Sequence, residues 1–169
     1  MRIVPLDPAW DRRTFTSGST PLDRYFHQQV TQDIRRRVTA CFVAIEEHSH
    51  RIAGYYTLAS ASIALVDLPA DVAKRLPRYP SVPAVRMGRL AVDQAFQGRG
   101  VGGVLLADAL ARALRADIAA YALVVDAKDA TAAAFYQHHG FIAFAGHPLT
   151  LFLPLTTAQA LGRVPPGCG

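Results

Sequence analysis

The segment QGRGVG, residues 97–102, places three glycines directly before the apolar run VLLADALARAL, residues 104–114. Apolar residues recur in this run at three- and four-residue steps, which predicts a helix from about residue 100 to residue 115. A helix N-terminus carries unpaired backbone N–H groups and a partial positive charge, and glycines before it let the backbone close on an anion. The segment is therefore either a plain turn or a phosphate-binding loop.

Two phosphate-loop patterns overlap in this segment. The dinucleotide pattern G-x-G-x-x-G is met by Gly98, Gly100 and Gly103, but it requires an acid about 20 residues further on, after the next strand. Asp117 lies instead near the end of the same helix. The pattern Q/R-x-x-G-x-G/A is met by Gln97, Gly100 and Gly102, and it is the one we favour.

The remaining chain alternates between strand and helix patterns. Strands are expected at residues 2–7, 39–46, 51–65, 84–92, 121–127, 141–145 and 150–155. Helices are expected at residues 20–38, at 100–115 and at 130–139, and a short one in the segment 68–80, opened by Pro69 and stopped before Pro77. This order predicts a mixed α/β sheet with helices on both faces, in a single domain over residues 1–169 with a loose tail from about residue 160.

Two of these helices carry capping patterns. Thr20 and Asp23 fit a capping box around Pro21 at the start of the first helix. Asp129 is expected to cap the helix at 130–139, and Gly140 followed by Phe141 fits a Schellman stop at its other end.

Composition and cysteine usage narrow the class of protein. Apolar residues make up 51% of the chain, and no run of about 18 apolar residues predicts a membrane span. The start MRIVPLDPAWDRR lacks the apolar core of a secretory signal. Cys41 and Cys168 form no CxxC pair, so we expect no disulfide framework, a core position for Cys41 and a cytoplasmic protein.

The net charge is +5, and sixteen Arg outnumber two Lys. A genome that favours arginine codons would explain this bias. A polyanionic partner is the alternative explanation, because guanidinium groups bind phosphates bidentately.

Three motifs stand in an order similar to that of the GCN5-related N-acetyltransferase (GNAT) family. They are RLAV at 89–92, the loop at 97–102, and VVDAKDATAAAFYQHHGF at 124–141. Together with GYYTLASASIAL at 54–65 and RLPRYPSVPAVRMGRLAVD at 75–93, they resemble in particular the GNAT toxins of bacterial toxin–antitoxin modules.

The resemblance implies a GNAT fold, in which a mixed, mostly antiparallel central sheet contains two splayed parallel strands. It implies acetyl-CoA as cosubstrate and acetylation of the α-amino group of aminoacyl-tRNA, which blocks translation. It further implies a small ribbon-helix-helix antitoxin and a homodimer.

The same resemblance implies roles for individual residues. Tyr136 would be the general acid near the CoA sulfur, since a phenol of ordinary pKa, about 10, is protonated at neutral pH. A half-buried aromatic residue packed beside Phe135 is the alternative. The acyl-CoA would contact Leu90, Ala91, Val92, Gln97, Gly98, Arg99, Gly100, Val101, Gly102, Gly103 and Phe135.

A general base is missing from the expected position on the strand before the loop. Both glutamates, Glu46 and Glu47, lie in a turn, while Asp93 and Asp126 end strands and are either bases or structural caps and ion-pair partners. A lysine amine with a pKa of about 10.4 needs help to lose its proton, whereas an α-amine titrates near 7.7–8.0. The absence therefore favours an α-amine acceptor.

Basic residues cluster in three segments of the sequence, and the resemblance gives them tRNA as a ligand. Solvated helix ends and ordinary ion pairs are the alternative explanation. The candidates for tRNA contact are Arg35, Arg36, Arg37, Lys74, Arg75, Arg78, Arg86 and Arg89.

Two other functions remain open from the sequence. One is a GNAT enzyme acting on a small-molecule amine or a protein N-terminus, and the other is a non-catalytic acyl-CoA-binding or interaction module. No metal site is expected, because His138 and His139 have no acid or cysteine at ligand spacing.

Overall fold

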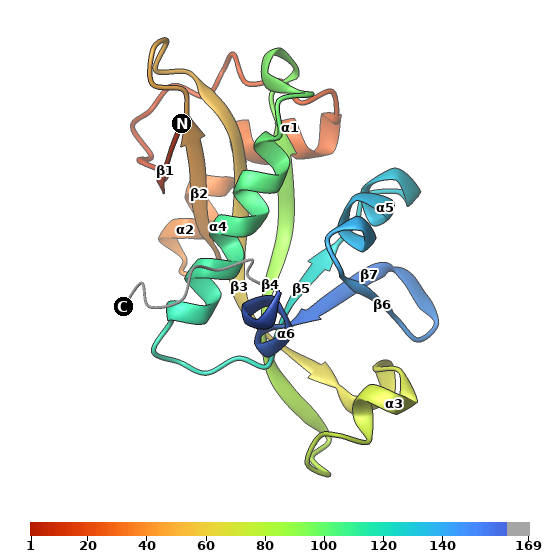
Figure 1. Cartoon of the computed structure of the whole chain (residues 1–169). Coiled ribbons are helices and arrows are strands. Elements are labelled where there is room, and N and C mark those ends of the chain that lie inside the picture. Colours follow the sequence, from red (N-terminus) through yellow and green to blue (C-terminus); the bar gives the residue numbers. More distant parts are fainter. Residues whose placement is uncertain (162–169) are drawn as a thin grey trace. The chain divides into compact units, whose positions relative to one another are not determined.

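The computed structural model describes residues 1–161, so Cys168 and most of the expected tail lie outside the described part. Its strands are β1 (Arg2–Pro5), β2 (Ala40–Ile45), β3 (Ile52–Ala64), β4 (Ser81–Val92), β5 (Ala122–Asp126), β6 (Ile142–Phe144) and β7 (His147–Pro154) (Figure 1). Its helices are α1 (Thr20–Gln28), α2 (Val30–Arg35), α3 (Ala70–Ala73), α4 (Val101–Arg115), α5 (Ala130–His138) and α6 (Leu155–Ala160). Within residues 1–161, no helix has the length and apolarity that crossing a membrane requires.

The strands form a seven-stranded sheet in the order β1-β2-β3-β4-β5-β7-β6. Strand pairs β1–β2, β2–β3, β5–β7 and β6–β7 are antiparallel, while β4 and β5 are parallel. The mixed, mostly antiparallel sheet is thus confirmed. The registered β4–β5 pairs run from Ala84↔Ala122 to Met87↔Val125, and β4 continues beyond them to Val92.

The chain divides into two compact units. The first unit comprises Met1–Ala59 and Gly88–Ala109, and the second comprises Ser60–Met87 and the described residues from Leu110 onward. Each unit has its own buried apolar cluster.

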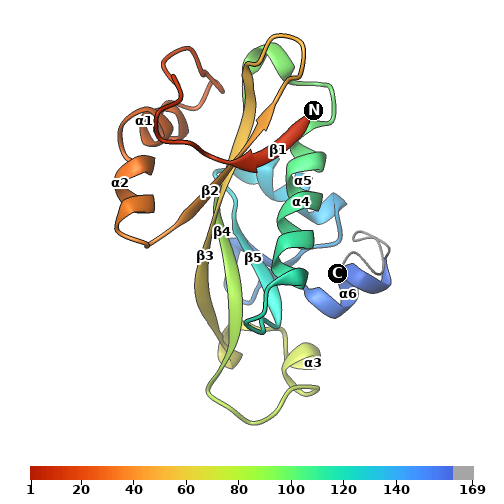
Figure 2. The same ribbon diagram turned by 90° about the vertical axis from the view of Figure 1, so that its left-hand side faces the viewer.

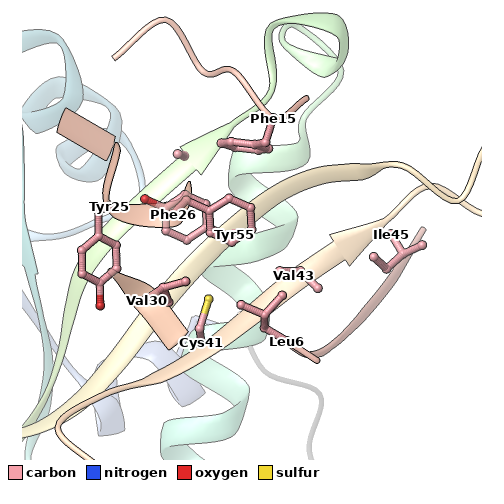
Figure 3. Packing of buried hydrophobic residues seen from close by; sticks show 10 residues of the cluster. Leu6, Phe15, Tyr25, Phe26, Val30, Cys41, Val43, Ile45 and Tyr55 are labelled. Carbon is pink, nitrogen blue, oxygen red and sulfur yellow. The ribbon is translucent and has the colours of Figure 1, made fainter. Parts of the chain in front are cut away.

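In the first unit, two aromatic rings form the centre of the core (Figure 3). The Phe26 ring of α1 stacks on the Tyr55 ring of β3 with centroids 4.2 Å apart, and Phe15 meets both rings edge-on. The Tyr55 hydroxyl donates to the Leu22 carbonyl at 2.7 Å, so this buried polar atom is satisfied. The stacked rings of Phe26 and Tyr55 thus pack α1 against the sheet.

The two faces of β3 in the first unit bury different partners, because successive residues of a strand point to opposite faces. Tyr55 faces α1, whereas the Tyr56 hydroxyl donates to Asp108 of α4 at 2.5 Å. Figures 1 and 2 show α1 and α2 on one side of β2 and β3 and α4 on the other. Helices on both faces were predicted, and here they are confirmed.

One buried cluster of the second unit lies on the face of β4, β5 and β7 that α3 covers. The Phe144 and Phe152 rings meet edge-on with centroids 5.7 Å apart, and Val72 and Ala73 of α3 pack on this cluster. Its buried members are Ile63, Leu68, Val82, Ala84, Ala122, Val124, Phe144 and Phe152.

Several predicted helix details are wrong. The helix expected at 20–38 is two helices that meet at Gln29, whose φ is −119° and which ends α1 and precedes α2. Val38, at the end of the predicted segment, lies beyond both helices and is 58% exposed. Asp23 forms no capping box, since its carboxylate accepts from the N–H and hydroxyl of Ser17 at 2.9 and 2.6 Å, and Ser19 is the N-cap residue.

Further differences lie in the second unit. The short helix predicted after Pro69 and before Pro77 is present as α3, but it is only four residues long and ends at Ala73. Helix α6 was not predicted at all.

Cys41 lies in the core, as predicted, and its burial raises the pKa of its thiol to about 12. In the unfolded chain a thiol titrates near 8.5. Because the folded pKa is the higher one, the stabilisation from a neutral Cys41 is fully present below pH ~8.5 and is lost as the pH rises toward 12.

Cys41→Ala should therefore flatten the fall in the free energy of unfolding between about pH 8.5 and 9.5, below the range in which tyrosines ionise. Urea unfolding at a series of pH values checks this. Equal slopes for the two proteins would show that Cys41 is not shielded from solvent in the folded state.

Candidate active site

The predicted phosphate loop, QGRGVG, connects the end of β4 to the N-terminus of α4 in the first unit. Gly98 and Gly100 both adopt φ +78°, a left-handed conformation that other residues rarely tolerate. A Cβ atom at either position would meet no atom within 4 Å, so the space in front of the loop is open. The glycines are thus required by backbone conformation and leave room for an anion.

Helix α4 supplies the backbone donors of this site. The N–H of Val104 donates to the Gly100 carbonyl at 3.1 Å, which makes Gly100 the N-cap residue of α4. The N–H groups of Val101, Gly102 and Gly103 come before that first intrahelical bond and have no helical acceptor. The Val101 side chain is buried, so any ligand contact of this residue is through its backbone. These donors fit a pyrophosphate group.

Two polar side chains hold the loop in place. The Gln97 amide donates to the carbonyls of Ser17 and Val92 at 2.9 and 3.0 Å. Asp93 is 2% exposed, and its carboxylate accepts from the N–H groups of Thr16 and Ala95 at 3.0 and 2.9 Å. Asp93 is therefore a cap of the turn at Gln94–Phe96, the structural alternative considered above.

Gly54 is a positioning residue that sequence reasoning missed. A Cβ atom there would lie 2.8 Å from both the Ala91 carbonyl oxygen of β4 and Cδ1 of Leu105 of α4. Only glycine allows β3, β4 and α4 to approach this closely. A glycine inside an otherwise apolar strand is the pattern that could have indicated such an approach.

Tyr136 lies on α5 in the second unit and is 4% exposed. Its ring packs against Phe135 and Phe141 with centroids 5.2 and 5.7 Å away. Burial, and secondarily the charge of Asp126, raise the pKa of its hydroxyl above the ordinary value. The Tyr136 hydroxyl therefore keeps its proton at neutral pH.

The ends of α5 fix the position of Tyr136. Asp129 caps the helix by accepting from the Ala132 N–H at 2.8 Å. At the other end Gly140 has φ +93°, and the Phe141 N–H donates to the Tyr136 carbonyl at 3.1 Å. The Gly140 N–H donates to the Gln137 carbonyl at 3.0 Å, which completes the predicted Schellman stop.

Arg86 and Asp126 form an ion pair between the parallel strands β4 and β5. The Arg86 Nη1 atom donates to both carboxylate oxygens at 2.7 Å, and both side chains are 40% exposed. The pair lies beside the last registered residues, Met87 and Val125. Asp126 is thus an ion-pair partner, and the charge of Arg86 is balanced within the protein.

The basic residues expected to contact tRNA are placed differently in the two units. In the first unit Arg35, Arg36 and Arg37 are exposed at the end of α2, while the Arg89 guanidinium lies 3.4 Å from the centroid of the Tyr25 ring. In the second unit Lys74, Arg75 and Arg78 are exposed after α3.

A match to the family model "Acetyltransferase (GNAT) domain" covers residues 37–143. The chain belongs to the GNAT acetyltransferase family. The matched segment contains the loop, the start of α4, the parallel strands and Tyr136. Among residues 1–161 no group of three or more His, Cys, Asp or Glu side chains could hold a metal ion.

Relatives of this GNAT chain include a curated protein and solved structures. A tRNA-acetylating toxin of Mycobacterium tuberculosis is 37% identical over 158 residues, which cover 92% of this chain and 93% of that protein. The structure of AtaT complexed with acetyl-methionyl-tRNAfMet has a TM-score of 0.84 and 27% identity, and the likeness covers 95% of this chain and 98% of that one. The structure of AtaTR bound with AcCoA has a TM-score of 0.78 and 28% identity, covering 95% and 96% of the two chains.

Proposed function

We propose that this GNAT domain is an acetyl-CoA-dependent N-acetyltransferase that acetylates the α-amino group of aminoacyl-tRNA and so blocks translation. The observation that carries the proposal is the 37% identity, over nearly the whole chain, to a tRNA-acetylating toxin. The likeness to AtaT in complex with an acetylated aminoacyl-tRNA supports the same acceptor.

The chemistry divides between named groups. The N–H groups at the start of α4, with Gly98, Gly100 and the exposed Arg99, bind the pyrophosphate of acetyl-CoA. The end of β4, residues Leu90 to Val92, and Phe135 beside Tyr136 contact the acyl arm. Acetyl-CoA supplies the acetyl group as a thioester.

Transfer forms a C–N bond to the acceptor amine and breaks the C–S bond. The Tyr136 hydroxyl gives its proton to the departing thiolate, the amine releases its own proton to solvent, and the Tyr136 phenolate regains a proton from solvent. A phenol whose pKa is raised by burial remains protonated throughout the physiological range, so Tyr136 carries a proton when the thiolate departs.

The carboxylates of the protein support an α-amine acceptor. Asp93 is buried and accepts two backbone N–H groups, and Asp126 is bound by Arg86. Bonds from Ser49 lower the pKa of Glu46 to about 2, and Glu47 lies 3.6 Å from the N-terminal amine. With these four engaged, an amine that is partly neutral at pH 7–8 suits the site better than a lysine amine.

The wider assembly is part of the same proposal. The two units act together as one catalytic domain, the active protein is a cytoplasmic homodimer, and a ribbon-helix-helix antitoxin restrains it. Arg35, Arg36, Lys74, Arg75 and Arg78 contact tRNA phosphates, since all five are exposed. Arg86 and Arg89 also contact tRNA, through guanidinium N–H groups that the ion pair with Asp126 and the stacking on Tyr25 do not use.

A substrate comparison tests the proposal. Acetyl transfer to charged tRNA is expected to weaken steeply with salt, and the triple variant Lys74→Ala, Arg75→Ala, Arg78→Ala should raise KM for tRNA at least about tenfold. KM for acetyl-CoA should not change. The proposal that tRNA is the acceptor would be contradicted if small amines or protein N-termini were acetylated efficiently and if that activity did not respond to salt or to these substitutions.

A further inference from the structure

A hollow in the first unit lies outside the groups assigned to acetyl transfer. Its volume is about 490 Å³, within the range of small-molecule sites. It is bounded by β1, the segment 10–15, and the β2–β3 turn. Its lining combines apolar and basic side chains: Phe15, Ile45 and Ile52 among the former, Arg2, Arg12 and Arg51 among the latter.

Arg12 is a fixed cation in this lining. Its Nε donates to the Phe26 carbonyl at 2.8 Å, and its Nη1 reaches the carbonyls of Pro8 and Trp10 at 3.3 and 3.4 Å. These acceptors are neutral, so they orient the guanidinium without balancing its charge. The site therefore holds a preorganised positive charge.

The acids of the same lining are bound to other groups. The Asp11 carboxylate accepts from Arg13 at 3.0 and 3.1 Å, and that pairing lowers the pKa of Asp11 to about 2. Asp93 accepts backbone N–H groups and lies 3.5 Å from Arg51 of the same lining, so the charge of Arg51 is balanced within the pocket and Arg2 and Arg12 supply the excess. Arg2 is exposed and forms no ion pair with any residue in the described part of the chain. The lining thus carries more positive than negative charge.

Trp10 provides a flat apolar surface in the same hollow. Its side chain is 36% exposed although tryptophan is among the most strongly buried residue types on average. An exposed indole beside guanidinium groups is the combination that binds a nucleobase by stacking and its phosphate by ion pairing.

We propose that this hollow, which we call the Trp10 pocket, binds a nucleotide, with the base on Trp10 and the phosphate at Arg2 and Arg12. The nucleotide is either free or a unit of single-stranded RNA, and the second source rests on the function proposed above. None of the residues that line the Trp10 pocket belongs to the CoA-binding loop, residues 97–103. Nucleotide binding in the pocket therefore does not require bound CoA.

The chain offers a direct reporter, since Trp10 is its single tryptophan. Titration with AMP should quench tryptophan fluorescence saturably, and an excess of acetyl-CoA should leave the response in place. Adenosine, which lacks the phosphate, should bind more weakly. An RNA trinucleotide that binds at least as tightly as AMP assigns the pocket to RNA, whereas binding of AMP alone assigns it to a free nucleotide.

Arg2→Ala is the matched test of the phosphate contact, because Arg2 lies exposed on β1 and its loss should not disturb the core. We expect about fivefold weaker binding of AMP, and no change for Arg115→Ala, an exposed arginine of α4. Both variants should melt as the wild type does.

Three outcomes would overturn the proposal: no quenching by AMP or the trinucleotide, equal responses to AMP and adenosine, or quenching that acetyl-CoA abolishes. None of these measurements depends on acetyl transfer. Failure of the pocket and failure of the proposed enzyme activity are therefore distinguishable.

Discussion

Tyr136→Phe is expected to lower kcat for acetyl transfer by about 10²- to 10³-fold while leaving acetyl-CoA binding nearly unchanged. The substitution removes one hydroxyl and keeps the ring that packs against Phe135 and Phe141. The thiolate then leaves without a proton donor, so the loss falls on the chemical step. Steady-state kinetics and calorimetric titration with acetyl-CoA measure the two effects separately.

Tyr121→Phe is the matched control, since Tyr121 lies in the same unit and burial raises the pKa of its hydroxyl as well. It should retain activity within about twofold of wild type. If Tyr136→Phe behaved like this control, Tyr136 would be only a packing residue, which is the alternative that the sequence left open. Because its pKa is raised, we also expect no loss of rate from Tyr136 deprotonation up to about pH 10.

Gly54→Ala is expected to destabilise the protein by about 2–3 kcal/mol, the cost of forcing a methyl group into a closely packed contact. The added Cβ would lie 2.8 Å from the Ala91 oxygen, a backbone atom that cannot rotate away. For a chain of this size such a loss should lower Tm by roughly 4–12 °C. It should also raise KM for acetyl-CoA, because α4 carries the N–H donors of the loop.

Gly88→Ala provides the control for a glycine-to-alanine change on a strand of the same unit. Its Cβ would make an ordinary contact, 3.7 Å from the Thr57 hydroxyl oxygen. Thermal melts of the two variants should therefore differ clearly. Equal melting temperatures would mean that β3, β4 and α4 are not packed as tightly at Gly54 as the structure indicates.

The sequence predicted best where a pattern has a single physical meaning. Asp129 and Gly140 bound α5 because one side chain caps a helix N-terminus and one positive φ ends it. Gly98 and Gly100 of the loop likewise stand where the backbone has a positive φ. Predictions that rested on side-chain spacing alone were less accurate. Asp23 has the spacing of a capping box, but its carboxylate accepts from the N–H and hydroxyl of Ser17 instead.

Tertiary contacts carried the information that the sequence lacked. Nothing local reveals that Arg86 pairs with Asp126 across 40 residues, or that Arg89 stacks on Tyr25. The same holds for the Trp10 pocket, whose lining comes from β1, an irregular segment, a turn and the residue after β4. Charge counting left a polyanionic ligand and a codon bias both open, and it could not say which arginines remain available for a ligand.

The most direct measurement uses isotopically labelled acetyl-CoA and tRNA charged with an amino acid. After mild base hydrolysis of the ester, mass spectrometry should detect labelled N-acetyl amino acid with the wild-type protein and about 10²-fold less with Tyr136→Phe. Uncharged tRNA should receive no label. If no charged tRNA yielded N-acetyl amino acid while a small amine or a protein N-terminus accepted the label, the proposed acceptor would be wrong.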